Sequence, residues 1–250
     1  MQKALQHDEI KEDEKENITE VWRYLLKKIK LKKDATIVEL APGFKSKIGL
    51  AAAQTDYQGT YHLIEPNDAA RASVLSSYQK IIQGRIYAHA TFFQEIKREE
   101  DLPEKIDLLC ANHALDDIVL AKGNSQEELC EFFSMNSGQK RIQKTKELWN
   151  KISDTQLNEY IKETVKEVYE FIKKLEPRIT ILSHYESKTL TENNILRPTI
   201  AGNKVSKLLY EEIQKNRNKK ITVNPVKREY TQYITEAGYG ENWMILGELR

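Results

Sequence analysis

The sequence predicts an α/β protein with a doubly wound, mostly parallel sheet of seven strands. Short, nearly continuous apolar runs alternate with helical patterns in the first half of the chain, which is typical of βαβ units. Such apolar runs suit strands that are buried on both faces of a parallel sheet. Near the C-terminus, two strand-like segments are joined by the Gly-rich turn at 237–240, and this pattern predicts an antiparallel hairpin.

The 250 residues suffice for one large domain with a sizeable core. We expect an N-terminal helical segment at 1–34 and a principal domain at 35–250 that carries a helical insertion at about 120–175. No internal repeat or low-complexity linker divides the chain.

The charge balance and the two cysteines exclude several classes of protein. Lysine and arginine total 39 and aspartate and glutamate 38, which argues against a dedicated nucleic-acid binder. Cys110 and Cys130 form neither a disulfide framework nor a zinc signature. The charged N-terminus has no secretory pattern, and no apolar run reaches the ~20 residues of a membrane span. These features together predict a cytoplasmic protein that does not enter a membrane.

The apolar periodicity sets the order of the elements. A helix with apolar positions from Val21 to Ile29 leads into the first strand. A second helix follows the turn after that strand, and a third is capped by Asn67 or Asp68. The five predicted parallel strands cover 37–40, 59–65, 85–91, 106–111 and 178–183, and the reversed strands cover 229–234 and 243–249.

The stretch between Leu120 and Pro177 contains no strand signal. Helices are predicted there at 127–133, 142–152 and 156–175, more than a simple crossover needs. We interpret this insertion, with the N-terminal helix, as a lid over the crevice at the ends of the strands.

The turn Ala41-Pro42-Gly43 separates the first strand from the next helix. Small residues at such a turn allow a tight bend and a close approach of backbone to a nucleotide-like ligand. Glu65 stands 22 residues after Gly43, at the end of the second strand. Nucleotide-binding βαβ units hold a ribose diol with a carboxylate at a separation of about 20 residues. The pattern serves a nicotinamide cofactor equally well.

The segment Val38-Glu-Leu-Ala-Pro-Gly43 resembles the first motif of class I S-adenosylmethionine-dependent methyltransferases. Glu65, the segment from Asp107 to Asn112 and the C-terminal hairpin fall where that family has its ribose-binding acid, its fourth motif and its reversed last strands. The resemblance implies a Rossmann-like fold, S-adenosylmethionine as cofactor, and contacts to it from Glu39, Ala41, Pro42, Gly43, Glu65, Pro66, Thr91, Phe92 and Asn112.

The chain departs from the family pattern at two places. Ala41 replaces the first glycine of the turn. No acidic residue stands near Thr91, where the family often has one that binds adenine, so adenine would contact the backbone or Phe92.

Polar residues follow the fourth and fifth strands on the same rim of the sheet. We expect His113 to act as a general base, because an unperturbed imidazole has a pKa of ~6.5, and we expect Asp117 to orient it. Asp116 is expected to hold the acceptor, although either aspartate would also serve as a helix cap. His184 and Tyr185 are expected to line the acceptor pocket, with loop packing as the alternative. No metal ion is assigned.

The sequence therefore predicts a methyltransferase that acts on a small-molecule acceptor. An NAD(P)-dependent reductase and a non-catalytic binding protein of the same fold are the alternatives. The acceptor, the atom methylated and the oligomeric state, a homodimer included, stay open.

Overall fold

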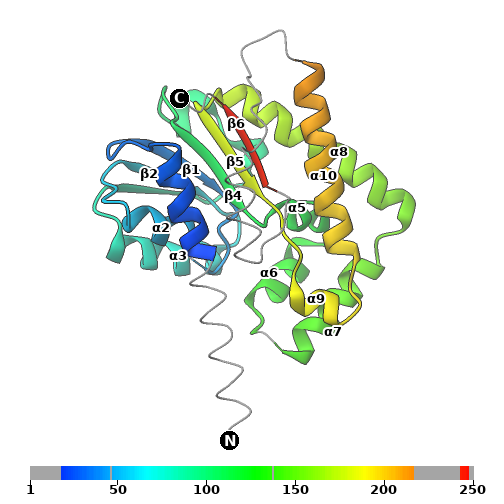
Figure 1. The fold of residues 1–250 in the computed structure, drawn as a ribbon. Helices are drawn as coiled ribbons and strands as arrows, with labels where there is room; N and C mark the ends of the chain where they lie inside the picture. Colours follow the sequence, from blue (N-terminus) through cyan, green and yellow to red (C-terminus); the bar gives the residue numbers. More distant parts are fainter. Residues whose placement is uncertain (1–17, 46, 137, 217–242, 248–250) are drawn as a thin grey trace, which may run out of the picture.

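A six-stranded sheet in the order β3-β2-β1-β4-β5-β6 lies at the centre of the computed structural model, which describes residues 18–45, 47–136, 138–216 and 243–247 (Figure 1). Five strands are parallel, and β6 runs antiparallel beside β5. The strands are β1 (Thr36–Leu40), β2 (Thr60–Ile64), β3 (Arg85–His89), β4 (Leu108–Asn112), β5 (Ile179–Ser183) and β6 (Trp243–Gly247).

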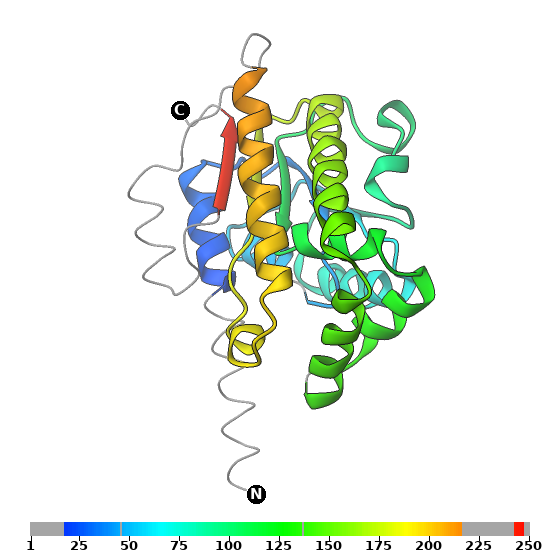
Figure 2. The same cartoon turned by 90° about the vertical axis from the view of Figure 1, so that its right-hand side faces the viewer.

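Helices cover both faces of this sheet (Figure 2). Residues 18–28 form a helix, here called the N-terminal helix. The remaining helices are α2 (Ile48–Ala53), α3 (Asp68–Ile81), the 3-10 helix η1 (Phe93–Glu95), α4 (Arg98–Asp101), α5 (Leu115–Lys122), α6 (Gln126–Ser134), α7 (Gln139–Asn150), α8 (Asp154–Leu175), α9 (Lys188–Glu192) and α10 (Arg197–Lys215).

The strands form where the apolar runs predict them because both of their faces are covered. In β1, Val38 and Leu40 enter one core layer and Ile37 enters the other, and all three are at most 2% exposed. The predicted parallel strands and the reversed last strand are therefore confirmed. Seven strands are not confirmed, because the predicted strand at 229–234 lies outside the described residues.

The N-terminal helix is part of the packed core. Val21, Trp22 and Leu25 are fully buried against the β-sheet layer that also contains Ile37 and Ile181. Figure 1 shows this helix, at the blue end of the colour scale, lying against one face of the sheet. Its assignment to a lid was therefore wrong, because its apolar side is used to cover the sheet.

The opposite face is covered by α5, α8 and α10, which pack against one another. Ser153 caps the N-terminus of α8: its hydroxyl accepts from the N–H of Gln156, and the Gln156 side chain accepts from the N–H of Ser153. Its buried residues recur at helical spacing, from Leu157 through Ile161 and Val165 to Leu175. The three helices predicted between Leu120 and Pro177 are confirmed, but α8 belongs to the layer that covers the sheet.

Of the three helices predicted for the insertion, only α6 and α7 do not belong to the layer formed by α5, α8 and α10. Leu129 and Phe132 of α6 join the core layer of α5 and α8. Helix α6 also contacts α3, which covers the other face. Helix α6 therefore contacts both layers that cover the sheet.

In the part of the chain that the structure describes, no helix is both long enough and apolar enough to cross a lipid bilayer.

Candidate functional site

The turn after β1 contains two residues with positive φ, although only one of them is a glycine. Ala41 and Gly43 both have positive φ, at 45° and 63°. This is the left-handed region, which glycine enters freely and other residues enter at a cost. Ala41 thus adopts the conformation for which related turns use glycine. An added Cβ on Gly43 would meet no atom within 4 Å, so space is open beside this residue.

These positive φ values predict opposite effects on stability when alanine replaces Gly43 and when glycine replaces Ala41. Gly43→Ala should lower the free energy of unfolding by about 1 kcal/mol, because an L side chain is strained at positive φ even where there is room. Ala41→Gly should leave it unchanged or raise it by about 0.5 kcal/mol, because relief of strain exceeds the added entropy of the unfolded chain. Urea unfolding measures both variants. A loss of stability in Ala41→Gly similar to that in Gly43→Ala would contradict the assignment of strain to this turn.

Glu65 ties the turn to the end of β2. Its Oε2 accepts from the N–H of Gly43 and its Oε1 accepts from the N–H of Asn67, each at 3.0 Å. Asn67 caps α3 through the N–H of Ala70, which confirms the sequence prediction of a cap there. Burial raises the pKa of Glu65, and the two N–H groups partly offset that rise. Pro66, between Glu65 and Asn67, is half-buried.

Glu39 lies under the turn and is 1% exposed. Its Oε2 accepts from the hydroxyls of Tyr61 and Tyr78, both at 2.6 Å. The hydroxyl of Tyr78 in turn accepts from the N–H of Gly49 in α2. Burial raises the pKa of Glu39 to about 7, against the lowering effect of the two tyrosine hydroxyls. The partners of this buried carboxylate in the structure are therefore two hydroxyls.

Thr91 and Phe92 follow β3 on the same rim, because β3 lies parallel beside β2. Phe92 is 38% exposed, and the side chain of Glu95 accepts from the Thr91 hydroxyl and the Phe92 N–H. The two residues therefore lie at the rim, where Glu95 fixes the backbone that carries the Phe92 ring.

Asn112, at the end of β4, lies in a polar chain that joins four elements. Its Oδ1 accepts from the indole N–H of Trp22 at 2.8 Å, and its Nδ2 donates to the Tyr185 hydroxyl at 3.1 Å. Lys47, beside the start of α2, donates to the same hydroxyl at 3.1 Å. The sequence pointed to Asn112 and Tyr185 separately. It missed the link through Trp22, 90 residues from Asn112, because that contact depends on how the N-terminal helix packs.

His113, Asp116 and His184 form a cluster next to these hydrogen-bonded side chains. The Nδ1 atoms of both imidazoles lie 3.5 Å from Oδ1 of Asp116, and the ring centroids are 4.8 Å apart. The Nε2 of His113 lies 2.7 Å from the carbonyl oxygen of Tyr185. Burial lowers the pKa of His113. Burial alone would raise the pKa of Asp116, but the two histidines outweigh it and hold that pKa below its usual value.

Asp117, next to this cluster in α5, interacts electrostatically with Arg141 of α7. The cap position of α5 is Ala114 and has no side-chain cap bond, so both aspartates lie in the first turn of the helix and neither caps it. Removal from water and the charge of Asp116 raise the pKa of Asp117 well above its usual range, and Arg141 acts in the opposite direction. Arg141 is half-buried, donates to the carbonyl of Met135 and lies 5.0 Å from the Phe132 ring centroid.

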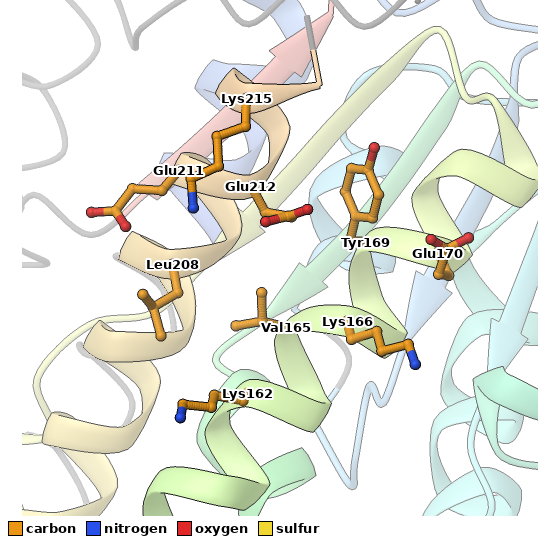
Figure 3. Close-up of a pocket in the computed structure, with 9 residues that line it drawn as sticks. All are labelled: Lys162, Val165, Lys166, Tyr169, Glu170, Leu208, Glu211, Glu212 and Lys215. Carbon is orange, nitrogen blue, oxygen red and sulfur yellow. The ribbon is translucent and has the colours of Figure 1, made fainter.

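A groove of about 460 Å³ between α8 and α10 lies elsewhere (Figure 3). It contains three lysines and three glutamates, so its charges balance. It lies towards the end of α8 that enters β5, whereas Glu65, Asn112 and His113 lie where their strands end. The groove is lined by Lys162, Val165, Lys166, Tyr169, Glu170, Leu208, Glu211, Glu212 and Lys215.

The chain is similar to known proteins in its fold and not in its sequence. No family model matches the chain, and none of the curated proteins matches it. Among solved structures, PH0851 superposes with a TM-score of 0.56 at 11% identity over 92% of this chain, which spans 45% of the length of PH0851. The plantazolicin methyltransferase BpumL in complex with SAH matches with a TM-score of 0.48 at 11% identity, over 99% of this chain and 90% of that one.

The likeness to PH0851 establishes a shared fold. The strand order, with β6 reversed beside β5, is the arrangement that the sequence resemblance implied. The fold is therefore shared with PH0851, and its strand order agrees with the one that the resemblance to class I methyltransferases implies.

Proposed function

We propose that the chain is an S-adenosylmethionine-dependent methyltransferase that acts on a small-molecule acceptor. The observation that supports this proposal most is the hydrogen bond that the N–H of Gly43 donates to the Glu65 carboxylate. The strand order reverses between β1 and β4, and ligands of doubly wound sheets bind at that switch point, outside the carboxyl ends of the strands. Gly43 and Glu65 lie at this point, together with Asn112 at the end of β4.

The residues of this rim fit the proposed cofactor. The open space beside Gly43 admits close approach of a ligand, and a side chain there would fill it. Each Glu65 oxygen accepts one N–H bond and keeps acceptor capacity for a ribose hydroxyl. Phe92, exposed at the end of β3, offers an aromatic surface to adenine. When bound, S-adenosylmethionine supplies an electrophilic methyl group.

The acceptor would lie between the rim and the insertion. Tyr185 and Lys47 offer polar groups beside Asn112 at the end of β4, and Asn112 fixes the Tyr185 hydroxyl. Arg141 of α7 acts electrostatically on Asp117 in the first turn of α5, which supports a position of the insertion beside the rim. A covered crevice favours a small acceptor over a polymer and excludes water from the transfer.

The catalytic roles of His113 and Asp117 stay predictions. The His113 imidazole is directed at the Tyr185 carbonyl and at Asp116, and its pKa is lowered by burial. A base at this position would keep its activity to lower pH than a solvent-exposed histidine.

Calorimetry with the full chain tests the proposed function. We expect S-adenosylmethionine and S-adenosylhomocysteine to bind with one site per chain, because the rim offers both a ribose acceptor and an open turn. NADPH should give no heat of binding. Binding of NADPH alone would support a reductase instead. Binding of none of the three by folded protein would support a non-catalytic protein of this fold.

A further inference from the structure

The cluster formed by His113, Asp116 and His184 has the composition of a transition-metal site. It joins the loop after β4, the first turn of α5 and the end of β5. One ligand atom from each residue lies within 4.8 Å of the other two. Two imidazoles and one carboxylate are a donor set that zinc and other first-row divalent metals accept.

Three buried polar atoms of this cluster have no hydrogen-bond partner among the residues that the structure describes. They are Oδ1 of Asp116 and both ring nitrogens of His184. His184 is 1% exposed and Asp116 is 4% exposed, so water does not satisfy these atoms from bulk. An unsatisfied buried polar group costs about 1–3 kcal/mol, and a charged one costs more. A bound cation between these atoms would remove that cost.

The hydrogen bonds around the cluster direct lone pairs towards its centre. The Tyr185 carbonyl only accepts, so Nε2 of His113 must carry the proton that it donates at 2.7 Å. In the neutral ring, Nδ1 then has a lone pair facing Oδ1 of Asp116 at 3.5 Å. Metal-binding histidines commonly donate their second ring N–H to a carbonyl or carboxylate in this way.

The two distances from Asp116 to the imidazoles agree with ligands around one ion. Two ligands at about 2.0–2.1 Å from zinc and at a tetrahedral angle are about 3.3 Å apart. Both imidazole Nδ1 atoms lie 3.5 Å from Oδ1 of Asp116, close to that separation. The backbone of His113, at φ 54°, is held in a strained conformation, and its N–H donates to the carbonyl of Ser183 at 2.9 Å.

The helix behind the cluster leaves room for the second imidazole. A Cβ on Gly202 of α10 would lie 2.1 Å from Cε1 of His184. His113 is the most exposed of the three, with 19% of its side chain accessible, so solvent reaches the cluster at this residue. Magnesium and calcium prefer sets made only of oxygen ligands, which this cluster does not offer.

We propose that His113, Asp116 and His184 bind one divalent first-row transition-metal ion of the zinc type, with an open coordination position towards the rim. In that arrangement His113 is a metal ligand and does not act as the general base. This inference does not depend on the cofactor, because zinc binding is measured without it.

Zinc titration of the chelator-treated full chain tests the proposal. Isothermal calorimetry and competition with a chromophoric chelator should show one zinc ion bound per chain. Asp116→Asn keeps the side-chain volume and should weaken zinc affinity at least a hundredfold. His113→Gln should do the same at a more exposed position, and it keeps the test valid if Asp116→Asn fails to fold.

His89→Gln is the matched control. His89 and His62 form a second imidazole pair, with Nε2 and Nδ1 3.0 Å apart, on β3 and β2. Zinc affinity should be unchanged in this variant. The proposal is overturned if the wild-type chain takes up no zinc, in which case a proton is shared within the cluster. It is equally overturned if Asp116→Asn or His113→Gln binds zinc as tightly as wild type.

Discussion

Glu65→Ala should weaken the binding of S-adenosylhomocysteine at least a hundredfold. Under the proposed function, the Glu65 carboxylate accepts both ribose hydroxyls. Hydrogen bonds to a charged group are worth about 1.5–3 kcal/mol each, so the loss of two amounts to about 3 kcal/mol or more. The variant also leaves the N–H of Gly43 without its acceptor at the turn. Calorimetric titration of wild type and variant measures the effect.

Asn67→Ala separates loss of the ribose contact from damage to the loop. Asn67 caps α3 two residues after Glu65, and its removal should cost about 1 kcal/mol of stability. Its affinity for S-adenosylhomocysteine should stay within a few-fold of wild type. If Glu65→Ala binds as tightly as wild type, or if both variants lose affinity equally, the ribose assignment is wrong.

The arrangement of the sheet was predictable because its signals are local. The parallel strands are buried on both faces, so their apolar runs are nearly continuous, as from Leu108 to Ala111. The spacing from Gly43 to Glu65 was equally visible, since adjacent parallel strands place their ends on one rim. The structure adds a direct bond between the two residues.

The contacts around the site were not predictable, because they join elements far apart in the sequence. Trp22 reaches Asn112 only through the packing of the N-terminal helix on the sheet. Arg141 is a charged residue in a helix rich in lysine, and nothing in its local pattern distinguishes it from solvated neighbours. The convergence of His113 and His184 depends on the pairing of β4 with β5.

Glu39→Gln should stabilise the protein at pH 8 by up to about 3 kcal/mol and change its stability little near pH 4.5. The pKa of Glu39 is raised from 4.5 to about 7 in the folded chain. Between these values the folded state keeps a proton that the unfolded state has lost, so this group makes wild-type stability fall as pH rises. One pKa unit corresponds to about 1.4 kcal/mol, and the fall is complete above the folded pKa.

The glutamine side chain of this variant would remain neutral at every pH, and its carbonyl oxygen would still accept from Tyr61 and Tyr78. Its amide N–H groups lack an acceptor there, which costs about 1 kcal/mol and sets the small loss expected near pH 4.5. Urea unfolding at both pH values measures the difference, with the exposed Glu147→Gln as a control that should behave as wild type.

The same variant addresses the predicted cofactor role of Glu39. A carboxylate that pairs with a cofactor cation would be needed for binding, so Glu39→Gln would then lower the affinity for S-adenosylhomocysteine while raising stability. A carboxylate that serves only to hold Tyr61 and Tyr78 would leave the affinity unchanged, because Gly49 and α2 would keep their contact through the Tyr78 hydroxyl. The raised pKa of Glu39 would be contradicted if the stability of the wild type did not fall relative to that of Glu39→Gln between pH 4.5 and pH 8.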